Sequence, residues 1–244
     1  MPARLPLRLT ALAALLGTAA RHAWFVESEV SGLAELVGPG SVVFDVGAEY
    51  GLYTWPLAAL VGPTGAVHAV EPQPELARHL RRTGAALGVH TVTLHELALS
   101  AQPGEGYLSQ PSRGRRPVHG RTFLANDTTG LGSNDEFDRH RNIDVDVETL
   151  DELVDRLGVT RLDFLKADVE GGEERLLAGA KATLERFRPT LLLELEDRHL
   201  ARFETSVAEV VDVLADLGYR PSHWEGRSWR PGIVGRNVLF RRPL

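Results

Sequence analysis

The stretch SVVFDVGAEYG at residues 41–51 holds the strongest fold signal in the chain. Its first half, SVVFDV at 41–46, is a short apolar run rich in β-branched residues, which is typical of a strand buried in a parallel sheet. Gly47 and Gly51 then form a G-x-x-x-G turn, and an apolar helix is expected over 52–61. A strand, a glycine turn and a helix in this order indicate the ligand-binding corner of a doubly wound α/β sheet.

The rest of the chain continues this alternation of strands and helices. Strands are expected over 66–70, 91–95, 162–167 and 190–195, helices over 72–87, 149–158, 173–187 and 206–218, and a C-terminal antiparallel hairpin within 219–240. Capping-box spacing marks two of the helix starts, in the pairs Thr149 with Glu152 and Ser206 with Glu209. Gly88 stands where the end of a helix favours a left-handed residue. Five such alternations predict a mainly parallel sheet with helices on both faces.

The composition limits the class of protein. The 244 residues are enough for one large domain, and 27 basic against 33 acidic residues give a net charge of −6. A dedicated nucleic-acid-binding protein usually carries the opposite charge, so no nucleic-acid partner is expected. The sequence has no cysteine, which excludes disulfides, cysteine zinc sites and a thiol nucleophile.

The first 29 residues are expected to be a helical extension of a domain spanning 30–244. Arg4 and Arg8 before the apolar run 9–20 imitate a secretory signal. Leucines at 5, 9, 12 and 16 have helical spacing, which favours a helix packed on the domain. The apolar run is too short to span a bilayer. We therefore expect a cytoplasmic protein with no membrane span, and the sequence leaves a homo-oligomer open.

Residues 102–142 are rich in Gly, Ser, Asn, Asp and Arg and are expected to be an irregular lid or acceptor-binding loop. The stretch carries a local basic patch of Arg113, Arg115, Arg116, His119 and Arg121. This patch is suited to an anionic or sugar-bearing acceptor, or it is a solvated face. Trp224 and Trp229, near the expected hairpin, are candidates for stacking on a sugar ring, or are ordinary core aromatics.

The turn after the first strand indicates a nucleotide-like cofactor without a pyrophosphate. A dinucleotide site favours three glycines in the pattern G-x-G-x-x-G, and only Gly47 and Gly51 are present. Asp45 would repel a pyrophosphate and attract an ammonium group. Glu71 lies 20 residues beyond Gly51, where a carboxylate binds ribose hydroxyls. That spacing alone does not separate NAD from S-adenosylmethionine, whose sulfonium, ammonium and ribose diol suit acidic partners.

Six segments together resemble the FkbM family of S-adenosylmethionine-dependent methyltransferases. They are DVGAEYGLYT at 45–54, EP at 71–72, ETLDEL at 148–153, FLKADVEGGEERLLAGA at 164–180, LLLELE at 191–196 and NVLF at 237–240. The resemblance covers roughly 30–240 and implies a Rossmann-like class I methyltransferase fold, with a seven-stranded sheet whose last strand is antiparallel. It also implies methylation of an oxygen, commonly a hydroxyl of a sugar or of a polyketide-type natural product. One departure is Glu49, where the family usually carries Asn.

The candidate site residues lie at the ends of the predicted strands. Those expected to bind the cofactor are Asp45, Gly47, Ala48, Glu49, Gly51, Tyr53, Thr54, Glu71, Pro72 and Asp168. Those expected to orient or deprotonate the acceptor are Asp168, Glu170, Glu194 and His199. Asp168 and Glu170 would share one face if both continued the strand.

Carboxylates after the last two parallel strands raise the question of a metal ion. Asp168, Glu194, Glu196 and Asp197 would form an oxygen-rich set that suits Mg²⁺. Alternatively, the acids at 196 and 197 are solvated residues at a helix start, with Arg198 and Arg202 as partners. The sequence does not decide between the two.

The predicted function is methyl transfer from S-adenosylmethionine to a hydroxyl of a sugar or glycoside, by direct in-line displacement. The partner is then a small-molecule acceptor. Three alternatives stay open: an O-methyltransferase of a polyketide-type product, an NAD-dependent oxidoreductase, and a non-catalytic cofactor-binding partner protein.

Overall fold

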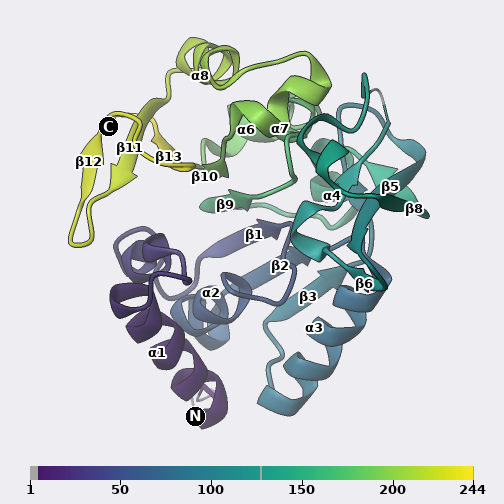
Figure 1. The fold of residues 1–244 in the computed structure, drawn as a ribbon. Helices are drawn as coiled ribbons and strands as arrows, with labels where there is room; N and C mark the ends of the chain where they lie inside the picture. Colours follow the sequence, from purple (N-terminus) through teal and green to yellow (C-terminus); the bar gives the residue numbers. More distant parts are fainter. Residues whose placement is uncertain (1–4, 127, 244) are drawn as a thin grey trace.

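The computed structural model describes residues 5–126 and 128–243 and contains two sheets (Figure 1). The main sheet has eight strands in the order β12-β11-β13-β10-β9-β1-β2-β3. Its parallel strands are β1 (Val42–Val46), β2 (Ala66–Val70), β3 (Val92–His95), β9 (Phe164–Ala167) and β10 (Thr190–Glu194). The predicted doubly wound α/β arrangement is confirmed.

Helices cover both faces of this sheet. One face carries α1 (Leu7–His22), α2 (Thr54–Val61) and α3 (Pro74–Leu87), and the other carries α4 (Leu150–Arg156), α5 (Glu173–Ala178), α6 (Lys181–Phe187) and α8 (Val207–Asp216). Neighbouring strand residues supply the two cores in turn, because side chains alternate across a strand. Val43 packs toward α2, and Phe44 packs in the core beneath α4 and α8.

The segment 173–187 is mostly helical, as predicted, but its helix is divided into α5 and α6. Asp151, at the start of α4, causes the break at Gly179 and Ala180. Its backbone N–H donates to the Gly179 carbonyl, and its carboxylate accepts from the backbone N–H groups of Ala182 and Thr183. A side chain from another helix therefore caps α6 and starts it anew.

The local helix signals are confirmed. Thr149 and Glu152 make both bonds of a capping box at α4. The Ser206 hydroxyl accepts from the Glu209 N–H at the start of α8. Gly88 ends α3 in the left-handed region, with φ 69°.

The C-terminal segment adds three strands: β11 (Arg220–Trp224), β12 (Trp229–Pro231) and β13 (Asn237–Arg241). β13 inserts between β10 and β11 and is antiparallel to both, so the expected antiparallel C-terminus is confirmed. The expected count of seven strands is one short, because β12 pairs with β11 at the sheet edge.

The two tryptophans of this segment are packing residues. Trp224 packs over Gly32, where an added Cβ would lie 2.8 Å from the indole ring. The indole N–H of Trp229 donates to the Gly32 carbonyl at 3.4 Å, and its side chain is buried. They join the hairpin to the 3₁₀ helix η1 (Ser28–Glu35), and the core interpretation holds for both.

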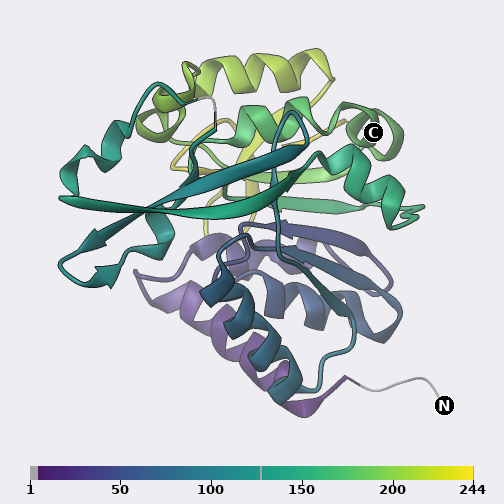
Figure 2. The same cartoon turned by 90° about the vertical axis from the view of Figure 1, so that its right-hand side faces the viewer.

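Residues 102–142 are not irregular, which corrects the sequence-based expectation. They contribute most of a second sheet with β5 (Gly104–Arg113) and β8 (Arg139–Glu148) as its long antiparallel pair, visible in Figure 2. Three two-residue strands complete it: β4 (Ala98–Leu99), β6 (Arg116–Pro117) and β7 (Phe123–Leu124). Short 3₁₀ turns lie between them: η3 (His119–Arg121) and η4 (Gly132–Glu136).

The N-terminal helix α1 packs on the domain through Leu9, which is fully buried, and Ala20. Leu5, Leu12 and Leu16 lie at the edge of the same core. Among the described residues, no helix combines the length and hydropathy needed to cross a bilayer.

A stack of rings on β1, β2 and β3 predicts loss of stability in acid. His68 Nδ1 lies 3.1 Å from His95 Nε2, and the His68 ring stacks on Phe44 at 4.6 Å. Burial, aided by His95, lowers the pKa of His68 to about 4. The pKa of His68 is lower in the folded protein than in the unfolded chain. The contribution of neutral His68 to the free energy of unfolding is therefore complete above pH 6.5 and is lost as the pH falls toward 4.

We therefore expect the unfolding free energy of the wild type to fall between pH 6.5 and 4 more steeply than that of His68→Phe. Urea unfolding of both proteins across this range measures the difference. Parallel pH profiles for the two proteins would contradict the prediction.

Candidate functional site

A cavity of about 260 Å³ lies at the carboxyl ends of β1, β2, β9 and β10, under the second sheet. Leu108, Phe123 and Leu124 of the second sheet supply apolar wall. Carboxylates supply much of the polar wall, namely Glu27, Glu49, Glu71, Asp168, Glu170 and Glu194. This is where ligands of a doubly wound sheet bind.

Gln73 attaches the second sheet above this cavity. Its side-chain oxygen accepts from Gln110 Nε2 at 2.9 Å and lies 2.8 Å from His119 Nδ1. His119 is the one member of the expected basic patch that lines the cavity. Arg113, Arg115 and Arg116 are exposed, which agrees with the solvated-face interpretation for them.

The glycine turn after β1 is shaped by close backbone packing. Gly47 has φ 78°, and a Cβ there would overlap the carbonyl oxygen of Asp168. Gly51 has φ 85°, and a Cβ there would overlap the indole of Trp55. The N–H groups of Gly47 and Ala48 both donate to the Val70 carbonyl. The turn therefore holds the ends of β1, β2 and β9 together.

Glu71 lies at the end of β2 and faces the cavity with 1% of its surface exposed. Its two oxygens each accept a backbone N–H at 2.8 Å, from Glu49 and from Gln73. Burial raises the pKa of Glu71 to about 8, against the effect of these two bonds. Its oxygens are therefore fixed in position, and each keeps acceptor capacity for a ligand.

Glu49 occupies the turn with φ 46°, an uncommon conformation for a non-glycine residue in which Asn is enriched. Its side chain lines the cavity close to Gly120. Burial, with repulsion from Asp168, raises the pKa of Glu49 to about 7. The strained position matches the one where the resembled family usually has Asn.

Replacing Glu49 by Asn should stabilise the protein by about 0.5–1 kcal/mol through relief of backbone strain. The gain should be larger at pH 8 than at pH 6. Because its pKa is raised, protonated Glu49 adds to the free energy of unfolding at low pH. That stabilisation is lost as the pH rises through 7.

Urea unfolding at both pH values measures the effect, with Glu49→Gln as the control. Glu49→Gln removes the charge but not the strain, so it should reproduce only the pH-dependent part. A Glu49→Asn protein no more stable than Glu49→Gln would show that the backbone is not strained.

Five predicted cofactor residues lie outside the set of described residues that line the cavity: Asp45, Ala48, Gly51, Tyr53 and Thr54. Asp45 is 1% exposed and accepts the hydroxyl of Thr54. Burial raises the pKa of Asp45 to about 6. The Tyr53 hydroxyl donates to Glu27 at 2.6 Å. These residues support the wall from behind, whereas Gly47, Glu49, Glu71, Pro72 and Asp168 face the cavity.

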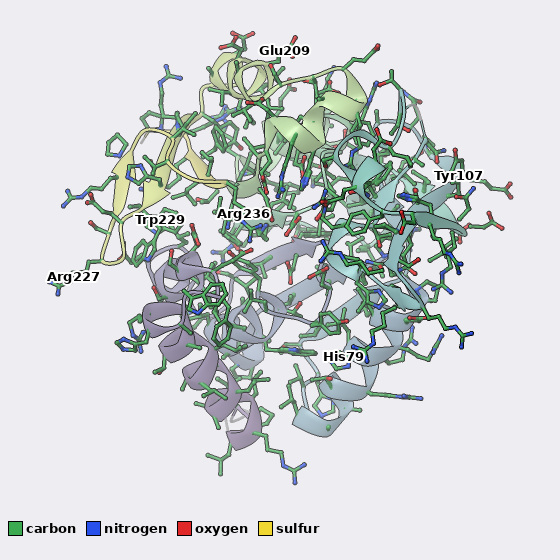
Figure 3. The ribbon with its side chains drawn as sticks, viewed as in Figure 1. His79, Tyr107, Glu209, Arg227, Trp229 and Arg236 are labelled. Atoms are coloured by element: carbon green, nitrogen blue, oxygen red, sulfur yellow. The ribbon has the colours of Figure 1, made fainter. Side chains whose placement is uncertain are left out.

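An acidic cluster occupies one end of the cavity. Carboxylate oxygens of Glu27, Asp168 and Glu194 all lie within 4.8 Å of one another. Arg236, labelled in Figure 3, lies 2.9 Å from both Glu27 and Glu194. Buried Lys166 has its Nζ 3.9 Å from Asp168. The sequence did not predict Glu27 or Arg236, because neither lies at the end of a predicted strand.

The proton distribution in this cluster is uneven. Burial and the Asp168 charge raise the pKa of Glu194 to about 10, against the attraction of Lys166 and Arg236, which favours the neutral form of Glu194. The pKa of Lys166 is raised as well, because the attraction of Asp168 and Glu27 outweighs burial. Asp168 therefore lies between a neutral carboxyl and a cationic ammonium group.

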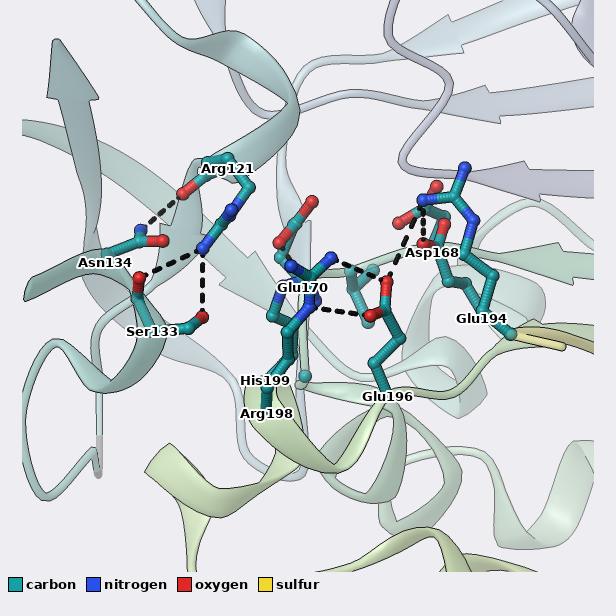
Figure 4. Close-up of polar contacts among 12 residues, drawn as sticks. Arg121, Ser133, Asn134, Asp168, Glu170, Glu194, Glu196, Arg198 and His199 are labelled. Atoms are coloured by element: carbon teal, nitrogen blue, oxygen red, sulfur yellow. Dashed lines mark hydrogen bonds and ion pairs between the residues drawn. The ribbon is translucent and has the colours of Figure 1, made fainter. Parts of the chain in front are cut away.

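Glu170 and His199 form a second polar pair beside the cluster (Figure 4). Glu170 has φ 55° in the turn after β9, so it does not continue the strand with Asp168. His199 Nδ1 lies 3.2 Å from Glu170 Oε2. Burial and Arg202 lower the pKa of His199 to about 4, so His199 is neutral. Only Glu170 of this pair lines the cavity, which leaves His199 as a residue that positions it.

The acids after β10 have protein partners of their own. Glu196 lies 2.6 Å from Arg198, and Asp197 accepts the backbone N–H of Val207 at 2.8 Å. Arg202 was a candidate partner but instead stacks on Phe123, with its guanidinium carbon 4.0 Å from the ring centroid. Glu196 and Asp197 therefore match the helix-start interpretation.

Comparison with known proteins gives one family for most of the chain. The family model described as "Methyltransferase FkbM domain" matches residues 45–221. The chain is 29% identical over 198 residues to the "31-O-demethyl-FK506 methyltransferase FkbM" of Streptomyces tacrolimicus, covering 74% of this chain and 69% of that one. It is 30% identical over 220 residues to the "AMB antimetabolite synthetase AmbE" of Pseudomonas aeruginosa, covering 79% of this chain and 10% of that one.

Among solved structures, the chain is similar to the methyltransferase FkbM of Methylobacillus flagellatus KT. The TM-score is 0.49 at 15% identity, covering 96% of this chain and 57% of that one. The chain thus spans just over half the length of that protein.

Proposed function

The chain belongs to the FkbM family of S-adenosylmethionine-dependent methyltransferases, and on that premise we propose that it methylates a hydroxyl oxygen of a sugar or glycoside. Its sheet has the Rossmann-like class I methyltransferase arrangement, with antiparallel strands at the C-terminal edge. The observation that carries the proposal is the cavity at the strand ends, with a carboxylate wall and an acidic cluster at one end.

The residues of the cavity fit S-adenosylmethionine better than a dinucleotide. The N–H groups of Gly47, Ala48 and Glu49 already donate to Val70 and Glu71, so this turn offers none of them to a pyrophosphate. Negative side chains would also repel a pyrophosphate, but they attract the ammonium and sulfonium groups of the methyl donor. These contacts argue against the NAD-dependent alternative.

Residues at both ends of the cavity would hold the cofactor. The fixed oxygens of Glu71 would accept the ribose hydroxyls, and the apolar wall around Val70, Pro72 and Leu99 would hold the base. The acidic cluster would face the positively charged end. When bound, the cofactor supplies an electrophilic methyl group on a sulfonium centre.

In the mechanism we propose, Asp168 would orient the acceptor hydroxyl and take its proton, and the bound cofactor would supply the methyl group to that oxygen, with its sulfur as the leaving group. Neutral Glu194 donates a hydrogen bond to Asp168 or to the acceptor. Lys166, 3.9 Å from Asp168, and Arg236, 2.9 Å from Glu27, balance the negative charge of the cluster. Because these two cations already neutralise the carboxylates, we propose a mechanism without Mg²⁺.

The test is incubation with methyl-labelled cofactor and a panel of small glycosides and polyketide-type alcohols, read by mass spectrometry with and without a chelator. We expect a labelled glycoside whose yield is unchanged by the chelator. Loss of transfer with chelator, restored by Mg²⁺, would replace the metal-free mechanism. Thermal shifts with S-adenosylhomocysteine but no transfer to any acceptor would favour the non-catalytic alternative.

A further inference from the structure

The molecule has a second hollow, of about 660 Å³, between the end of α1, the segment that follows it and the residues leading into β13. Its lining includes Arg21, His22, Trp24, Phe25, Glu29 and Asn237. We propose that this hollow binds the ring of the sugar acceptor, with Trp24 stacked on the apolar face of the sugar. The proposal rests on the proposed function and names the subsite that it requires.

The aromatic wall of the hollow is unusually exposed. Trp24 is 94% exposed and Phe25 is 74% exposed, with their rings edge to face at 5.9 Å. Trp55 and Trp229 are buried. A large exposed aromatic pair beside a concave polar wall indicates a ligand surface, and the C–H face of a pyranose stacks on such a ring.

The other wall of the hollow is polar. It includes Asn237, which is 3% exposed. Arg21, His22 and Glu29 make the rest of this wall polar, which suits a sugar better than an apolar polyketide chain.

The hollow adjoins the acidic cluster of the cofactor cavity. Glu27 and Arg236 line both spaces and form an ion pair at 2.9 Å, and the Arg236 side chain is 48% exposed. Arg236 also contacts Glu194, next to Asp168. A sugar ring in the hollow would therefore direct a hydroxyl past this ion pair toward Asp168.

The experiment compares Trp24→Ala with wild type, using the glycoside that the wild type methylates best. We expect KM for the glycoside to rise at least tenfold, with kcat and the affinity for S-adenosylhomocysteine within about twofold. Trp24→Tyr should restore KM, because it restores the stacking ring. Tyr107→Ala, which removes an aromatic side chain 41% exposed on the second sheet, is the matched control and should change nothing.

Saturation-transfer NMR of the glycoside on protein loaded with S-adenosylhomocysteine gives a readout independent of turnover. We expect a signal with wild type that is lost with Trp24→Ala. If Trp24→Ala keeps methyl transfer, KM and the NMR signal unchanged, the hollow is not the sugar-binding site. The proposed function would still stand. Transfer to polyketide-type alcohols alone, with no glycoside signal, would overturn both.

Discussion

Asp168→Asn is expected to lower kcat by about 10²–10⁴-fold, the range for loss of a general base. The amide cannot accept the acceptor proton, although its size and position are kept. Affinity for S-adenosylhomocysteine should change by less than about threefold, because this product has lost the sulfonium charge that the carboxylate faces. Single-turnover rates and calorimetry with S-adenosylhomocysteine measure the two effects separately.

Glu194→Gln is the matched control, because it replaces another carboxyl of the same cluster. Burial raises the pKa of Glu194 to about 10, so an amide resembles its neutral form. Its loss of kcat should be about tenfold or less, as for one hydrogen bond in the transition state. If Glu194→Gln loses as much as Asp168→Asn is expected to lose, and Asp168→Asn retains activity, Glu194 is the base instead.

The location of the site was predictable because it depends on short-range pattern. An apolar run such as 41–46 is buried on both faces wherever it folds, and a glycine turn after it marks the carboxyl end of a strand. Glu71 and Asp168 follow two more such runs, so the topology alone brings them to one edge. Both residues line the cavity.

The second sheet was not predictable from the same signals. β5 includes Gly104, Gly106 and Pro111, which are typical of turns, and much of β8 is charged. These strands form because they pair with each other, from Gly104 opposite Val147 to Ser112 opposite Arg139. Pairing partners 27 to 43 residues apart leave no local pattern. The strands also partly cover a polar cavity rather than a fully apolar core.

The sequence also did not predict which side chains line the cavity. Asp45 and Thr54 belong to the motif that indicated the cofactor, yet they bond to each other behind the wall. Glu27 and Arg236 lie outside the strand ends, and they reach the cluster because η1 packs against β11 and β13 pairs with β10. Motif membership therefore identified the neighbourhood, and tertiary packing determined which side chains face the ligand.

Glu71→Gln is expected to weaken S-adenosylhomocysteine binding roughly 30- to 100-fold, the range for losing hydrogen bonds to a charged group. The ionised carboxylate accepts from two backbone N–H groups and would accept from two ribose hydroxyls as well. An amide presents an NH₂ group to one of those backbone donors instead. Glu96→Gln, at an exposed ion pair with Arg81, is the control and should bind as the wild type does.

The same substitution should remove a pH dependence of binding. In the empty cavity burial raises the pKa of Glu71 to about 8, and ribose hydroxyls favour the ionised form, so binding below pH 8 releases a proton. Affinity for S-adenosylhomocysteine should therefore rise between pH 6.5 and 8.5. Calorimetry in buffers of different ionisation enthalpy counts this proton. If Glu71→Gln still releases it while Glu49→Gln does not, the linked carboxyl is Glu49, whose pKa is raised to about 7.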